Sequence, residues 1–163
     1  MFSSKPEKFL HPGDFYFSRS GQMGTLLGSC IAMVLWHPIL KIGGMCHFVL
    51  PECHGHGLGS GDLNGRYAID AMELFRRAAR SENTRLKEYQ GMIYGGGNVV
   101  AALACPDNDS IGMRNASTAM DLLTQEKVAI MIVDVGETWS RRISFDIASG
   151  EVAVKRQGTL ASA

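Results

Sequence analysis

Residues 31–50 read IAMVLWHPILKIGGMCHFVL, two apolar runs on either side of a short polar break. The runs at 31–36 and 41–50 are rich in branched side chains, which is typical of β-strands. The break, residues 37–40, carries Pro38, and proline suits the second position of a type I turn. The pattern therefore predicts a β-hairpin with a four-residue loop at residues 37–40.

The register of this hairpin brings two reactive side chains together. A loop at 37–40 pairs Trp36 with Lys41, so that paired positions sum to 77 and Cys30 lies opposite His47. Opposed residues of an antiparallel pair point to the same face, with Cβ atoms about 4.5–5.5 Å apart. The register therefore predicts a thiol–imidazole dyad, in which a cysteine is the nucleophile and a histidine its base.

The remaining pattern indicates a mixed α/β domain, a sandwich of β-sheets and helices, that spans residues 1–163 as one unit. Apolar residues recur at helical spacing in residues 66–80 and 113–126, and residues 98–104 are a third, shorter helical candidate. Residues 51–64 are rich in glycine and histidine and are expected to be a loop. The other expected strands are residues 14–17, 91–94, 128–135, 141–147 and 151–155.

Composition excludes several classes of function. The chain has 163 residues, 45% of them hydrophobic, and its 16 Lys and Arg balance 16 Asp and Glu, so no basic run favours nucleic acid as a partner. The polar N-terminal segment is not followed by an apolar stretch, and no run of 18 apolar residues occurs, so membrane insertion is not expected. The chain is expected to be cytoplasmic.

The cysteines point to chemistry rather than to crosslinks or metal. There are four, Cys30, Cys46, Cys53 and Cys105, without CxxC spacing, and a reducing compartment keeps such residues as thiols. The segment Cys53-His54-Gly55-His56 fits no standard structural zinc pattern, so no metal site is expected. Any of the four thiols remains a candidate nucleophile.

The surroundings of Cys30 suit nucleophilic catalysis. Gly28 and Ser29 precede it, where the chain can turn sharply and leave backbone N–H groups free to face an oxyanion. An imidazolium at His47 would lower the pKa of the thiol, and Thr25 could accept a hydrogen bond from the other ring nitrogen. The residues alone leave a second interpretation open, in which Cys30 is an inert buried thiol, His47 a core histidine and Thr25 an ordinary strand residue.

The sequence resembles the CheD family. Residues 25–32, Thr-Leu-Leu-Gly-Ser-Cys-Ile-Ala, and residues 41–51, Lys-Ile-Gly-Gly-Met-Cys-His-Phe-Val-Leu-Pro, are similar to its signature of a Leu-Gly-Ser-Cys strand followed by a Gly-Gly-Met-x-His-x-x-Leu-Pro strand. The resemblance continues in order along the chain, through residues 67–72, 95–97, 111–115 and 134–136.

The resemblance implies hydrolysis of selected glutamine side chains on methyl-accepting chemotaxis receptors to glutamate and ammonia, through a cysteine thioester and without a cofactor. It implies a catalytic triad of Cys30, His47 and Thr25, with Gly28 and Ser29 shaping the substrate site. It also implies a fold related to the deamidating cytotoxic necrotizing factor toxins, and a CheC-type phosphatase as a partner besides the receptors.

Two segments differ from the family pattern. Residues 95–100 read Gly-Gly-Gly-Asn-Val-Val where the family has Gly-Gly-Ala-x-x-Phe, and residues 136–142 lack the Gly-Gly doublet and Gly-Arg pair that usually follow the aspartate. Two alternatives therefore stay open beside the receptor deamidase. One is a non-catalytic binding module that regulates a CheC-type phosphatase, and the other is a cysteine amidase acting on a different protein.

Overall fold

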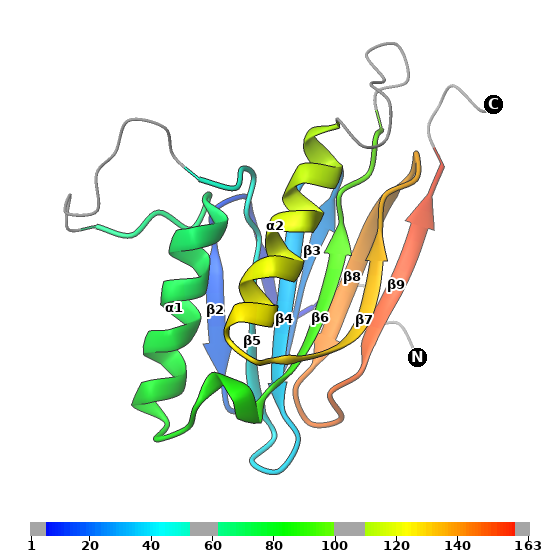
Figure 1. The fold of residues 1–163 in the computed structure, drawn as a ribbon. Helices are drawn as coiled ribbons and strands as arrows, with labels where there is room; N and C mark the ends of the chain where they lie inside the picture. Colours follow the sequence, from blue (N-terminus) through cyan, green and yellow to red (C-terminus); the bar gives the residue numbers. More distant parts are fainter. Residues whose placement is uncertain (1–5, 53–61, 100–109, 159–163) are drawn as a thin grey trace.

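The computed structural model describes residues 6–52, 62–99 and 110–158, which form two β-sheets and two α-helices in three layers (Figure 1). Helices α1 (Ala68–Ser81) and α2 (Ile111–Gln125) pack on a five-stranded sheet of order β2-β5-β4-β6-β7, and a four-stranded sheet of order β1-β3-β8-β9 covers its other face. A short 3-10 helix, η1 (Leu86–Glu88), follows α1. The strands are β1 (Lys8–Leu10), β2 (Phe15–Ser18), β3 (Gln22–Leu27), β4 (Ile31–His37), β5 (Ile42–Cys46), β6 (Gln90–Gly95), β7 (Ala129–Val135), β8 (Ser140–Asp146) and β9 (Val152–Gln157). The predicted mixed α/β sandwich is confirmed.

Strand β4 lies at the centre of the five-stranded sheet and is buried on both faces. Its odd-numbered residues, among them Ile31 and Met33, pack toward the helices, whereas Ala32 and Val34 pack toward the four-stranded sheet. Burial on both faces explains why this strand is a continuous apolar run rather than an alternating one. Cys30, which has the parity of Ala32, packs against the core between the two sheets.

Most predicted elements are present within two residues of their expected ends. The helices expected at 66–80 and 113–126 are α1 and α2, and the Ser110 side chain caps α2 by accepting a hydrogen bond from Met113 N at 3.1 Å. The pattern does not predict β1, or β3 as a separate strand, because β1 is only three residues long and β3 contains a glycine. Of the helix expected at 98–104, residues 98 and 99 are not helical and the rest lies outside the described residues.

The predicted register of the first hairpin is wrong by two positions. Trp36 pairs with Gly43 rather than Lys41, and His37 pairs with Ile42, so that paired positions sum to 79. The loop still has four residues but occupies 38–41, because His37 is the last residue of β4. The His37 ring accepts a hydrogen bond from Leu40 N at 3.0 Å. The loop closes with Lys41 N donating to His37 O, 2.8 Å away.

Candidate active site

Thr25, Cys30 and His47 lie between the two sheets at the end of the fold where β6 terminates, the upper end in Figure 1. Beyond the paired part of the hairpin, Ile31 N donates to Phe48 O at 3.1 Å and Phe48 N donates to Ile31 O at 2.9 Å. This pairing places His47 opposite Ala32 and makes Cys30 its diagonal neighbour on the same face. The predicted direct opposition is therefore wrong, but the predicted shared face is correct because a shift of two positions preserves it.

The hydrogen bonds of Thr25 fix the proton on the His47 ring. Thr25 Oγ1 donates to Leu10 O at 2.7 Å and lies 2.7 Å from His47 Nδ1. A hydroxyl has one proton, so Thr25 must accept from His47, and the ring carries its hydrogen on Nδ1. His47 Nε2 is then left with a lone pair, and this buried atom has no hydrogen-bond partner among the described residues. The ring is oriented as a base.

Burial keeps both members of the dyad neutral. It lowers the pKa of His47 to about 4, with the charge of Asp14 acting in the opposite direction and that of His11 lowering the value further. Burial also raises the pKa of the half-buried Cys30 thiol. The sequence-based expectation of an imidazolium that lowers the thiol pKa is therefore wrong: the resting pair is a thiol and a neutral imidazole.

Cys46 shows what an inert thiol looks like in the same fold. It is fully buried on the helix side of its sheet, and burial raises its pKa to about 12. Cys30, by contrast, is partly exposed. Reactivity of a cysteine requires access as well as deprotonation, so Cys30 is the candidate nucleophile of these two. Cys53 and Cys105 lie outside the described residues.

A glycine segment holds the backbone on both sides of the nucleophile. Gly96 N donates to Cys30 O and Gly97 N donates to Gly28 O, both at 2.9 Å. The approach requires glycine at position 95, where φ is +113° and a Cβ atom would lie 2.1 Å from Cys30 O. The run of glycines that follows β6 is therefore explained by its contact with the segment 28–30.

Asn115 is a supporting residue that sequence reasoning did not single out. Its side chain is buried in α2, and Nδ2 donates to Ser29 O at 3.2 Å and to Val49 O at 2.7 Å. One amide thus ties the residue before Cys30 to the segment after His47. The available signal was an asparagine among small residues on the buried face of a helix, next to Ala116.

A buried arginine supports the same glycine segment from the other side. Arg141 is 1% exposed, and it donates to Gly95 O at 3.1 Å and to Asp134 Oδ1 at 3.0 Å. Gly136 N also donates to Gly95 O, at 3.0 Å. The segment that departs from the family pattern therefore packs directly behind the residues that hold Cys30.

Among the described residues, no group of three or more His, Cys, Asp or Glu is placed to bind a metal. The segment Cys53-His54-Gly55-His56 lies outside these residues.

Comparisons with known proteins point to one family. A family profile described as CheD chemotactic sensory transduction matches residues 49–156. The chain belongs to the CheD family. A protein of Dechloromonas aromatica (strain RCB), named "Probable chemoreceptor glutamine deamidase CheD 3", is 40% identical over 147 residues, which cover 90% of this chain and 85% of the relative. A CheD relative of Pseudomonas savastanoi pv. phaseolicola is 40% identical over 153 residues, covering 93% and 85%, and one of Chromobacterium violaceum is 36% identical over 149 residues, covering 91% and 76%.

Membership in the CheD family confirms the resemblance read from the Leu-Gly-Ser-Cys and Gly-Gly-Met-x-His segments. In the described part of the chain, no helix has the length and apolar character needed to cross a membrane.

Proposed function

We propose that this chain is a protein-glutamine deamidase that hydrolyses glutamine side chains of methyl-accepting chemotaxis receptors. One observation carries the proposal: Thr25 holds His47 with its hydrogen on Nδ1, so that Nε2 can act as a base on the face it shares with Cys30. The relatives named as chemoreceptor glutamine deamidases support the choice of substrate. Residues 1–163 act as one domain, in the cytoplasm and without a cofactor.

In the first half of the reaction, Cys30 Sγ attacks the carbon of the glutamine amide and His47 Nε2 takes the thiol proton. Because both groups are neutral at rest, proton transfer accompanies the attack instead of preceding it. The imidazolium that forms is stabilised by its Nδ1–H bond to Thr25. It then returns the proton to the departing nitrogen, the C–N bond breaks, and ammonia leaves a thioester on Cys30.

In the second half, water attacks the thioester carbon while His47 Nε2 accepts a proton from it, and the imidazolium then protonates the departing Cys30 sulfur. The products are glutamate and the free thiol. Gly28 and Ser29 shape the site, and the backbone N–H groups of Ser29 and Cys30, which donate to no acceptor in the described part of the chain, are the candidates for stabilising the oxyanion.

Intact-mass analysis of a purified receptor cytoplasmic fragment tests the proposal. The wild-type chain should add about one dalton per modified site, the difference between an amide and an acid, and Cys30→Ala should add nothing. Cys46→Ala is the matched control, since its thiol is buried and should be dispensable. Equal activity of the Cys30→Ala chain would exclude the mechanism.

A CheC-type phosphatase is a further proposed partner, supported by the family resemblance. Tight binding of this phosphatase together with no deamidation of any cognate receptor would favour the non-catalytic module. Deamidation of a different protein would retain the chemistry and change the substrate.

A further inference from the structure

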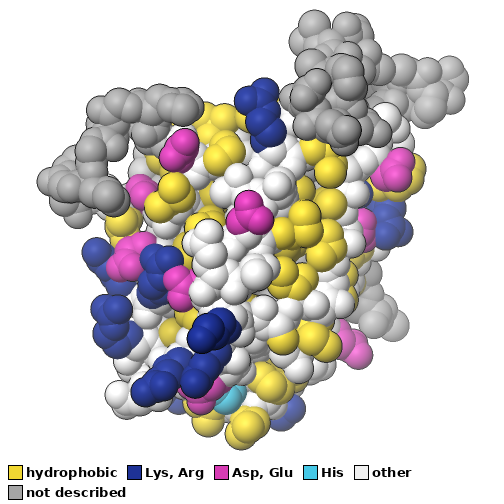
Figure 2. Space-filling view, in the orientation of Figure 1, with side chains coloured by type: hydrophobic (Ala, Val, Ile, Leu, Met, Phe, Trp, Pro, Cys, Tyr) yellow, Lys and Arg dark blue, Asp and Glu magenta, His cyan; other side chains and the backbone are white. Residues whose placement is uncertain are grey.

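A basic cleft lies at the opposite end of the fold from Thr25, Cys30 and His47. Its volume is about 630 Å³, and it opens between the C-terminal ends of α1 and α2 and the helix η1. Figure 2 shows the cluster of Lys and Arg side chains at this lower end. The cleft is lined by Arg76, Ala79, Arg80, Asn83, Thr84, Arg85, Leu86, Lys87, Gln125, Glu126 and Lys127. Five of the chain's 16 Lys and Arg residues therefore line one cleft that contains a single carboxylate.

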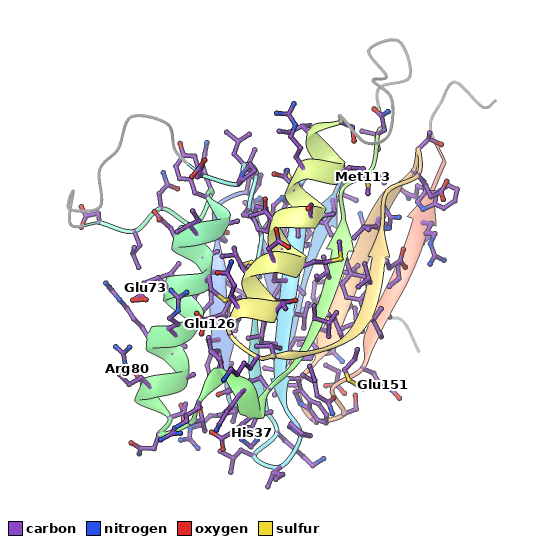
Figure 3. All side chains as sticks on the ribbon, viewed as in Figure 1. His37, Glu73, Arg80, Met113, Glu126 and Glu151 are labelled. Carbon is purple, nitrogen blue, oxygen red and sulfur yellow. The ribbon has the colours of Figure 1, made fainter. Side chains whose placement is uncertain are left out.

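Part of the positive charge of the cleft is not neutralised by its own surroundings, since Arg85 lies near Glu88 but three other cations have no carboxylate partner among the described residues. Arg76 is engaged, since its guanidinium lies 2.5 Å from Glu126 Oε1 and 3.2 Å from Glu73 Oε1. Figure 3 shows Arg80 and Glu126 near the lower ends of α1 and α2. Arg80, Lys87 and Lys127 are exposed and have no carboxylate within ion-pair distance among the described residues. In a chain of zero net charge, this is a concentrated excess of one sign.

Lys127 occupies a backbone conformation that its side chain does not favour. It follows α2 with φ of +60°, in the left-handed region where glycine or asparagine is usual after a helix. The matching position after α1 is Asn83, with φ of +57°, which tolerates this region better. Replacing Lys127 by glycine would therefore remove one charge from the lining of the cleft and relieve the backbone at the same time.

The shape of the cleft favours carboxylates presented by another protein over a compact phosphate ligand. Both helices meet the cleft with their C-terminal ends, so the described lining lacks the converging N–H groups of a helix N-terminus that typically bind a compact phosphate, and an anion here would be bound by the long cationic side chains. Its two apolar lining residues, Ala79 and Leu86, offer no aromatic surface for a base. Long cationic side chains from three separate segments, α1, residues 85–87 and the turn after α2, suit several spaced carboxylates.

We propose that this cleft is a docking site for a carboxylate-rich segment of a protein partner. It lies about 21 Å from the N-terminal end of α1, the length of that 14-residue helix. Docking here leaves the segment around Cys30 open, and it does not depend on the deamidase chemistry.

Binding of fluorescein-labelled poly-L-glutamate to the full chain, followed by anisotropy at low salt, tests the proposal. Lys87→Gln combined with Lys127→Gly should weaken binding about five- to tenfold. The matched control is Arg142→Gln with Lys155→Gln, which removes two exposed charges that lie opposite each other on β8 and β9. This control should change the affinity less than twofold.

A separate readout distinguishes binding from a structural role. Lys127→Gly relieves the left-handed backbone of a non-glycine residue, so this single variant should raise Tm while it weakens binding. Equal affinity of the cleft variant and the control would overturn the proposal. The proposal would also be overturned if tripolyphosphate or a DNA duplex bound more tightly than poly-L-glutamate and if that binding depended equally on Lys87 and Lys127.

Discussion

Replacing Thr25 by valine removes the hydroxyl that orients the candidate base while it keeps the shape of the side chain. Two hydrogen bonds of 2.7 Å are lost, one from His47 Nδ1 and one to Leu10 O, in a site where Thr25 is 1% exposed. At about 0.5–1.5 kcal/mol each, their loss should lower the free energy of unfolding by about 1–3 kcal/mol. The His47 hydrogen is then free to move to Nε2, which removes the lone pair that accepts the thiol proton.

If the transition state loses the same 1–3 kcal/mol of stabilisation, kcat should fall by about 5- to 150-fold. The rate is measured by the mass gain of a receptor fragment, stability by urea unfolding, and the ring tautomer by ¹⁵N NMR of His47. Thr25→Ser, which keeps the hydroxyl, is the control and should stay within a fewfold of wild type. If Thr25→Val deamidated at the wild-type rate with His47 still protonated on Nδ1, the assigned role of Thr25 would be refuted.

Four further outcomes follow from the same site. His47 has a pKa of about 4 in the folded chain and about 6.5 in the unfolded chain, so the free energy of unfolding should fall by about 3 kcal/mol as pH drops through this window. In urea titrations, His47→Gln should abolish that part of the pH dependence. Because burial raises the pKa of the Cys30 thiol, the thiolate absorbance at 240 nm that distinguishes wild type from Cys30→Ala should be absent at pH 7 and should appear at a higher pH in the folded than in the unfolded chain. A signal at pH 7 would indicate a preformed ion pair instead. Asn115→Ala, which releases Ser29 O and Val49 O, should cost about 1–3 kcal/mol of stability and speed the alkylation of Cys30 by iodoacetamide; an unchanged alkylation rate would contradict the clamp. Gly95→Ala should lower Tm more than Gly136→Ala does. Both positions have positive φ, but the new Cβ at 95 lies 2.1 Å from a backbone carbonyl oxygen, whereas that at 136 lies 3.4 Å from a methionine sulfur.

The elements that the sequence predicted well are those whose pattern is long and periodic. Helices α1 and α2 each carry several turns of apolar residues at helical spacing, and β8 and β9 alternate around a short glycine turn, so that local pattern and tertiary structure agree. Strand β1 has only three residues, and its place in the sheet comes from parallel pairing with β3, a distant contact that local pattern does not encode.

The supporting residues of the site were harder to predict, because their roles depend on contacts between segments far apart in the chain. Asn115 acts on Ser29, 86 positions away, and Arg141 acts on Gly95, 46 positions away. The direction of the pKa shifts was also missed, since it depends on the burial that the two sheets impose on His47 and Cys30. Residue types identify candidates for chemistry, but the protonation state is a property of the folded environment.

The error in the hairpin register shows why the candidate dyad could nevertheless be found. Side chains alternate between the faces of a strand, so a slip of one residue would have turned His47 away from Cys30, whereas the observed slip of two exchanges the direct partner for a diagonal one on the same face. The direction of a side chain therefore depends on whether the slip is odd or even, and its distance depends on the size of the slip. At a diagonal separation the imidazole needs a second support to fix its angle, and Thr25 on β3 of the other sheet provides one by holding Nδ1. For this reason the site requires both sheets, and a hairpin alone would not orient the base.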